Sequence, residues 1–135
     1  MRRAAGFVLV AATTGRILFL LRRDGTWGIP GGLAESYDRS PVATATRELR
    51  EETGYEGPLA LERTPLVERA WPGQLLYVTL GAVVPQEFRC IFGDREHTAS
   101  RWAFGSTPPE PLHRGVREAL ASLNERAASA LDVLE

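Results

Sequence analysis

Apolar residues along the chain gather in short blocks that are separated by turns. The blocks at residues 7–11 and 17–21 flank Thr14-Gly15, and this arrangement predicts two paired strands joined by a turn. Similar blocks predict further strands at residues 59–61, 65–69, 75–84, 88–92 and 101–104, with a Pro72-Gly73 turn between two of them. The pattern therefore favours a protein built around a sheet.

Residues 41–53 carry the pattern of a helix. Ser40 provides an N-cap, Pro41 a first-turn proline and Gly54 a stop. We expect one face of this helix to pack, and it consists of Val42, Ala45, Thr46, Leu49 and Thr53. A second helix is predicted near the C-terminus, where apolar residues repeat at helical spacing at Leu112, Val116, Leu120 and Leu123.

The segment at residues 27–32 reads Trp-Gly-Ile-Pro-Gly-Gly. Its glycines and proline exclude a helix interior, so we predict a loop whose backbone approaches neighbouring atoms closely. With the strands and helices this gives one domain over residues 1–135, of the α+β class. We expect an α/β/α sandwich, in which a mixed sheet is packed between helices.

Composition and charge exclude several classes of function. The formal charge of -1 argues against a protein that binds nucleic-acid duplexes or membrane surfaces. The apolar N-terminus is interpreted as strand and turn rather than signal peptide, and no segment reaches transmembrane length. The single Cys90 excludes an intrachain disulfide and predicts an inert core thiol in a reducing compartment. We expect a cytoplasmic protein.

Three carboxylates crowd the end of the predicted helix. Glu51 lies about 60° to one side of Glu48 on a helix, and Glu52 lies about 40° to the other. Like charges at this spacing repel one another, and the helix C-terminus disfavours negative charge. The cluster is either a solvated acidic face or a place where cations bind.

The surrounding residues resemble the Nudix hydrolase box. Gly31-Gly32, the helix start at Pro41 and the run RELREETGY at residues 47–55 carry the resemblance, and the run matches the C-terminal half of the box throughout. The N-terminal half departs from it: Asp38 stands where the family has Glu, and one extra residue lies near Arg39. We expect Asp38 still to reach Arg47.

The resemblance implies a mixed curved sheet and a divalent metal site for Mg²⁺, with Mn²⁺ as a substitute. Its implied metal ligands are Glu48, Glu51, Glu52 and a backbone carbonyl of Gly31 or Gly32. Its implied catalytic residues are Glu51, Glu48 and Glu96, the last from a Glu-His pair ahead of Trp102, and which of them is the general base stays open. Asp38, Arg47 and Gly54 would support the box.

Substrate contacts are predicted from residue chemistry. Arg22 and Arg23 suit phosphate, although strand alternation lets only one face the site. Trp27 and Trp71 could stack on a base, with Tyr37 and Tyr77 as further candidates. We expect His97 to be a hydrogen-bonding loop residue, and His113 to be structural or solvent-exposed.

By resemblance, the chain is a pyrophosphohydrolase acting on a small nucleotide, as a monomer or homodimer. The leading substrate is a nucleoside triphosphate, cleaved to the monophosphate and pyrophosphate. A dinucleoside polyphosphate or ADP-ribose is the alternative. A third hypothesis is a nucleotide-sensing Nudix domain without activity, but that class typically loses box glutamates that are present here.

Overall fold

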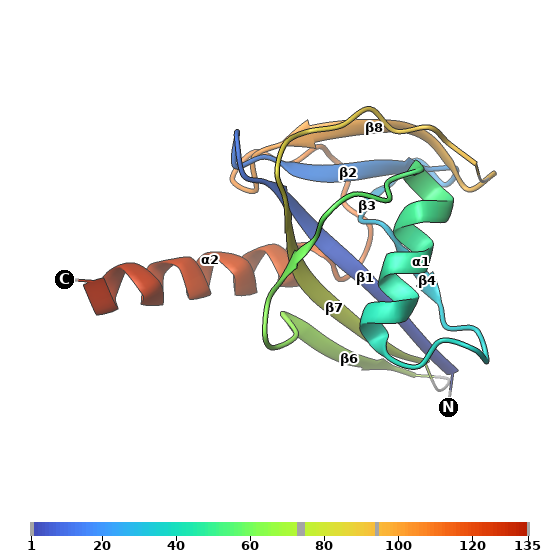
Figure 1. The fold of residues 1–135 in the computed structure, drawn as a ribbon, viewed down its shortest axis with the longest axis horizontal. Coiled ribbons are helices and arrows are strands. Elements are labelled where there is room, and N and C mark those ends of the chain that lie inside the picture. Colours follow the sequence, from blue (N-terminus) through green and yellow to red (C-terminus); the bar gives the residue numbers. More distant parts are fainter. Residues whose placement is uncertain (1, 73–74, 94, 135) are drawn as a thin grey trace.

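The computed structural model describes residues 2–72, 75–93 and 95–134 (Figure 1). Each helix follows a run of strands, in the order β1 (Arg2–Ala11), β2 (Ile17–Arg22), β3 (Trp27–Gly28), β4 (Gly31–Leu33), α1 (Pro41–Thr53), β5 (Ala60–Leu61), β6 (Val67–Trp71), β7 (Leu75–Val84), β8 (His97–Ala103) and α2 (Val116–Leu134).

Strand β1 lies at the centre of a mixed sheet. It pairs in parallel with β7 along its whole length, from Arg2 opposite Leu75 to Ala11 opposite Val84. On its other side it pairs antiparallel with β2 and with β4. Strands β5 and β6 add to β7, and β3 and β8 add to β2. The mixed sheet of the predicted α+β fold is therefore confirmed.

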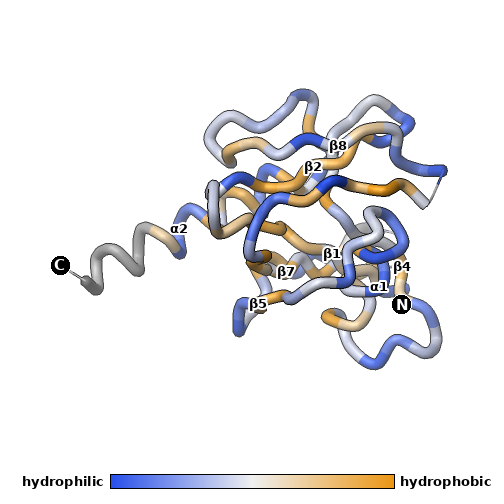
Figure 2. Tube along the Cα trace, turned by 45° about the horizontal axis from the view of Figure 1, so that its top comes forward, coloured by the Kyte–Doolittle hydropathy of each residue, from blue (hydrophilic) through white to orange (hydrophobic). Residues whose placement is uncertain are grey.

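The two faces of the sheet are covered by different helices. Successive strand residues point to opposite faces, so Phe7 and Leu9 of β1 pack with Leu49 of α1. Val8 packs on the opposite face with Val116 and other residues of α2. Figure 2 shows hydrophobic residues concentrated on the strands. The fold is thus a sandwich with α1 on one face and the start of α2 on the other.

Helix α1 begins and ends where the sequence predicts. The Ser40 side chain accepts a hydrogen bond from the Ala43 N–H at 3.1 Å, and Gly54 has the left-handed φ of 80° that favours glycine. The predicted packing face is wrong at Thr46, which is exposed. Thr44 is buried instead, because its hydroxyl donates to Asp38 at 3.0 Å, a partner that lies before the helix.

Two other predicted segments differ from the structure. The glycine-rich segment is not wholly loop, because β3 and β4 are formed within it. Residues 88–92 form no strand: Phe88 and Phe92 pack against the core beside α1 while Ile91 is exposed. Their alternation comes from packing of an extended segment and not from strand pairing.

The remaining predictions fall as follows. The strand predicted at residues 101–104 is β8, which starts earlier. Helix α2 starts at Val116, and Leu112 before it forms a bridge to Trp27. Gly73 of the predicted Pro72-Gly73 turn lies outside the described residues. In the part of the chain that the structure describes, neither helix has the length and apolarity needed to cross a bilayer.

Candidate active site

Glycines bring strands β1 and β4 unusually close to other groups. Gly31 faces Gly6 across the two strands, and a Cβ on Gly31 would lie 2.7 Å from the Ala5 carbonyl oxygen. The hydroxyl of Tyr77 fills the space beside these two glycines. A Cβ on Gly32 would lie 2.6 Å from the carboxyl carbon of Glu48. The absent side chain of Gly32 is therefore what lets the Glu48 carboxylate lie against β4.

Arg47 organises the acidic helix from within. Its guanidinium donates to the Leu33 carbonyl at 2.9 Å, to Glu48 at 3.1 Å and to Glu51 at 3.1 Å. It is buried, so these contacts are shielded from water. Arg47 thus fixes helix α1 against β4 and partly neutralises two of the three glutamates.

The contact expected between Asp38 and Arg47 is present. Asp38 accepts a hydrogen bond from Arg47 Nη2 at 2.9 Å, and it also accepts from the Glu35 N–H and the Thr44 hydroxyl. These donors, with Arg47 foremost, lower the pKa of Asp38 to about 2. The shorter acid and the extra residue before Ser40 therefore still anchor the loop to the helix.

Glu48 lies at the edge of a pocket, with its side chain only 17% exposed. Desolvation raises the pKa of Glu48 above its usual value, and the charges of Glu51 and Glu96 raise it further, while Arg47 lowers it. A desolvated carboxylate with two further carboxylates near it favours a bound cation, even with Arg47 beside it. The oxygen-rich composition suits a hard ion such as Mg²⁺.

The three glutamates of the helix point in different directions. Glu51 is half exposed and pairs with Arg47. Glu52 is buried, where its Oε1 accepts the Gly31 N–H at 2.8 Å and its Oε2 lies 3.2 Å from His97 Nδ1. Among the residues that the structure describes, no three acidic, histidine or cysteine side chains are gathered as a metal centre. Metal binding by all three glutamates stays a prediction.

His97 is not the loop residue that the sequence suggested. It begins strand β8, pairs with Arg22 of β2 and is buried beside Glu52. Glu52 is thereby held between a backbone N–H of β4 and a side chain of β8, so it links α1 to two separate strands.

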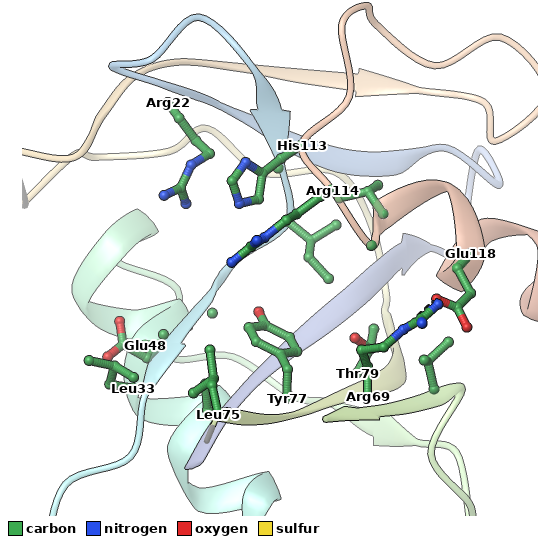
Figure 3. A pocket seen from close by; sticks show the side chains of 18 of the residues that line it. Arg22, Leu33, Glu48, Arg69, Leu75, Tyr77, Thr79, His113, Arg114 and Glu118 are labelled. Carbon is green, nitrogen blue, oxygen red and sulfur yellow. Dashed lines mark hydrogen bonds and ion pairs between the residues drawn. The ribbon is translucent and has the colours of Figure 1, made fainter. Parts of the chain in front are cut away.

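A pocket of about 460 Å³ extends from Glu48 across the face of the sheet that α2 covers. Figure 3 shows Glu48 at one end, the Arg69–Glu118 pair at the other and Tyr77 between them. Arg22, His113 and Arg114 lie along one wall in the same view. Burial raises the pKa of the Tyr77 phenol, so Tyr77 stays neutral over the physiological range.

The predicted substrate contacts divide between this pocket and other places. Arg22 and Glu96 line it, together with the backbone of Gly31 and Gly32. Arg23 turns away, and its Nε donates to the Arg95 carbonyl. This difference follows from the alternation of side chains along β2.

The aromatic candidates are placed differently. Trp27 is buried in the core beneath α2, where the guanidinium of Arg101 lies 4.9 Å from its ring centre, and it does not line the pocket. Its predicted stacking on a base therefore gives way to a packing role. The side chain of Trp71 lies outside the described residues. Tyr77 is the aromatic candidate that reaches the pocket, whereas Tyr37 is exposed beside Arg47.

The sequence did not indicate the part of the pocket formed by residues before and within α2 together with Arg69 of β6. His113, expected to be structural or exposed, lines the pocket and lies 3.1 Å from the Thr26 hydroxyl. Burial lowers the pKa of His113, and the neighbouring charge of Arg22 lowers it further. Arg114, Arg69 and Glu118 also line the pocket. No local signal marks these residues, because they meet only when α2 packs on the sheet.

The site therefore consists of a pocket bordered by strand β4, which begins with two glycines, and by helix α1, which carries the glutamates. The NUDIX domain family model matches residues 1–103, and the chain belongs to this family.

Solved structures of Nudix proteins share the fold. The Nudix hydrolase RenU of M. smegmatis is 26% identical with a TM-score of 0.74, over 93% of this chain and 85% of that one. A MutT NUDIX hydrolase from Burkholderia pseudomallei is 27% identical with a TM-score of 0.67, over 90% and 96%. An Ap4A hydrolase of C. elegans has a TM-score of 0.77 at 16% identity, over 96% and 99%, a likeness of fold alone.

A curated relative matches a shorter stretch. Protein 111R of Invertebrate iridescent virus 3 is 42% identical over 55 residues, which make up 41% of this chain. The match spans about a third, 31%, of that relative's length.

Proposed function

We propose that this protein is a Mg²⁺-dependent pyrophosphohydrolase that cleaves a nucleoside triphosphate to the monophosphate and pyrophosphate. The observation that carries the proposal is the pocket itself, in which Glu48 and the glycines of β4 stand at one end and Arg22 on an adjoining wall. Membership of the NUDIX family and the hydrolases among its structural neighbours support the same reaction class.

The residues at the acidic end fit a divalent cation. Glu48 and Glu96 present oxygens to the pocket, and Gly32 leaves the space that the Glu48 carboxylate fills. Glu48, Glu51, Glu52 and a carbonyl of Gly31 or Gly32 would hold the ion, with Mn²⁺ as a substitute. When bound, Mg²⁺ neutralises the pyrophosphate and helps to activate water for attack on phosphorus.

The chain's own residues contribute binding and proton transfer. Arg22 is suited to a phosphate oxygen, because its buried Nε has no hydrogen-bond partner among the described residues and its nearest acid, Asp24, is 3.8 Å away. Glu48, Glu51 or Glu96 accepts the proton of the attacking water. A raised pKa brings Glu48 closer to the range in which a carboxylate serves as a base.

The fold does not select the substrate, because one fold hosts many specificities. Structural neighbours include an Ap4A hydrolase and a domain crystallised with ADP-ribose, and both resemble this chain in fold alone. Dinucleoside polyphosphates and ADP-ribose therefore belong in the test panel. Binding without hydrolysis of any of these nucleotides would instead indicate a sensor.

The test is a hydrolysis panel in ¹⁸O water with Mg²⁺, which identifies both the products and the phosphorus attacked. We expect Glu48→Gln and Glu52→Gln to lower kcat by orders of magnitude with the circular dichroism spectrum unchanged. Glu56→Gln is the matched control, because Glu56 is exposed and lies outside the pocket. Near-wild-type activity in both box variants would overturn the assignment of the site.

A further inference from the structure

A chain of three polar side chains, Asp24, Thr26 and His113, leads into the pocket. The Thr26 hydroxyl lies 2.6 Å from Oδ1 of Asp24 and 3.1 Å from Nδ1 of His113. The Thr26 N–H also donates to Asp24 Oδ1, at 2.9 Å. The chain therefore begins in the exposed turn after β2 and ends at an imidazole that lines the pocket.

The backbone of His113 is fixed to strand β3. Its N–H donates to the Trp27 carbonyl at 2.8 Å. Gly28 follows Trp27 and lines the pocket, where a Cβ would lie 3.4 Å from Arg22 Cδ and 3.8 Å from His113 Cβ. The sheet therefore sets the position of the imidazole, which Figure 3 shows alongside Arg22 and Arg114 on the pocket wall.

The protons along this chain have one consistent arrangement. The hydrogen bonds from Thr26 lower the pKa of Asp24, and an ionised carboxylate can only accept. The Thr26 hydroxyl has a single proton, which its short contact to Asp24 uses. Its oxygen must then accept from His113, so the neutral imidazole carries its proton on Nδ1. Nε2 is left as an acceptor, and no hydrogen bond from the described residues reaches it.

The imidazole is neutral at physiological pH and therefore needs a hydrogen-bond donor from the ligand. Burial lowers the pKa of His113, and the charges of Arg22 and Arg114 lower it further against the opposing charge of Asp24. Phosphate oxygens are acceptors and cannot bond to Nε2, although the two arginines beside it suit phosphate. The donor must therefore belong to a group close to a phosphate. In a 5′-nucleotide the nearest donors are the ribose hydroxyls, because the base lies on the far side of the sugar.

We propose that His113 is a specificity residue whose Nε2 accepts a hydrogen bond from a ribose hydroxyl, so that the pocket selects an intact ribose. Asp24 and Thr26 are positioning residues, because they act through the tautomer of His113. This inference rests on the proposed nucleotide substrate and assigns the recognition of its sugar.

Nitrogen-15 NMR of the imidazoles tests the proton arrangement without any nucleotide. The chain has two histidines, so the signals that disappear in His113→Gln belong to His113. We expect Nδ1 to carry the proton at neutral pH. Thr26→Ser should keep this tautomer because it retains the hydroxyl, whereas Thr26→Val should let the two tautomers mix. A wild-type His113 with its proton on Nε2 would overturn the proposal.

Calorimetry with AMP and GMP, each compared with its 2′-deoxy and 3′-deoxy analogues, tests the contact with the sugar. Loss of a neutral hydrogen bond weakens binding by about fivefold, so we expect that loss for at least one analogue, whichever base is present. His113→Phe keeps a ring without an acceptor and should bind nucleotide and analogue equally. His113→Gln should restore the preference, because the glutamine oxygen can replace Nε2. Melting temperatures check that both variants fold.

The outcomes separate this inference from the proposed reaction. Equal binding of the nucleotides and their deoxy analogues, or no binding of either, would overturn the contact and leave the reaction to the ¹⁸O panel. A preference for the intact ribose that survives His113→Phe would overturn the role of His113. A preference that depends on His113, in a protein that hydrolyses none of the panel, would support the contact and overturn the reaction.

Discussion

Asp38 and Arg47 illustrate how single residues set up this site. Arg47 contacts Asp38 in the loop before α1, the Leu33 carbonyl of β4 and two glutamates of α1. Its charge is therefore shared by groups that precede the helix and groups within it. Asp38 supplies the anion that balances it in a buried place. A change at either residue should therefore alter both stability and the position of the glutamates.

Asp38 predicts a specific loss of stability in acid. The pKa of Asp38 is about 2 in the folded protein against an ordinary 3.8, so between these values the unfolded chain binds more protons than the folded one. The stability that Asp38 contributes is complete above about pH 4 and is lost as the pH falls towards 2. We expect Asp38→Asn to lower the free energy of unfolding at pH 7 and to remove this acid-dependent part.

Urea unfolding between pH 2 and pH 7, followed by circular dichroism, measures the effect. The exposed Glu56→Gln variant is the control, and its curve should parallel that of wild type. An Asp38→Asn variant that keeps the full acid dependence would show that Asp38 is not the group responsible.

At the scale of elements, the site depends on the contact between β4 and α1. Gly31 and Gly32 are neighbours in sequence but lie against different groups: Gly31 meets backbone atoms of β1, while Gly32 meets the end of the Glu48 side chain. Backbone cannot move aside without disturbing the sheet, whereas a side chain can rotate. Gly31 is therefore needed for the sheet to form, whereas Gly32 is needed for the position of the Glu48 carboxylate.

Alanine at Gly31 should mainly lower stability, whereas alanine at Gly32 should mainly lower kcat. Gly31→Ala should destabilise the fold by about 1–3 kcal/mol, the usual cost of overpacking. Gly32→Ala should cost less stability but displace the Glu48 carboxylate and lower kcat by up to about 100-fold, since small misplacements of reacting groups are costly. Melting temperatures and kcat of both variants provide the test, and equal loss of stability in the two would contradict it.

Helix α1 could be predicted from the sequence because its ends are set locally. Ser40 caps its own helix and Gly54 adopts its own left-handed conformation, so neither needs distant partners. The box glutamates and the reach of Asp38 to Arg47 followed from the same short-range spacing. The segment 88–92 could not be predicted in this way, because its alternation is equally compatible with packing and with strand pairing.

The far end of the pocket was beyond sequence analysis for a different reason. Arg69 and Glu118 stand 49 residues apart and belong to a strand and a helix that meet only in the folded protein. Thr44 was missed on a smaller scale, since its burial depends on Asp38 outside the helix. The sequence predicted the features set by neighbouring residues, which are the helix ends and the spacing of the motif. The features that it missed depend on tertiary packing.

At the scale of the whole molecule, we expect the glutamates to make the folded protein a better cation binder than the unfolded chain. Glu48, Glu51 and Glu96 act on one another only when α1 and the segment before β8 are in place. A ligand that binds the folded state alone adds to its stability. The proposed metal site therefore predicts a change in the free energy of unfolding that can be measured without any substrate.

We expect Mg²⁺ to stabilise the protein against unfolding by about 1.4 kcal/mol at ten times its dissociation constant. Urea unfolding with Mg²⁺, and again with EDTA, measures the difference, and NaCl at matched ionic strength controls for screening. Glu48→Gln should reduce the gain. A wild-type protein equally stable with Mg²⁺ and with EDTA would argue against a preformed cation site.

The parallel pairing of β1 with β7 also has a consequence for how the chain is made. Arg2 pairs with Leu75, 73 positions later, so β1 leaves the ribosome well before its partner β7. At a synthesis rate of about 5–20 residues per second, that wait is roughly 4–15 s. During this interval a strongly apolar strand lacks its longest partner, so the nascent chain presents a binding segment for chaperones before the pocket has formed.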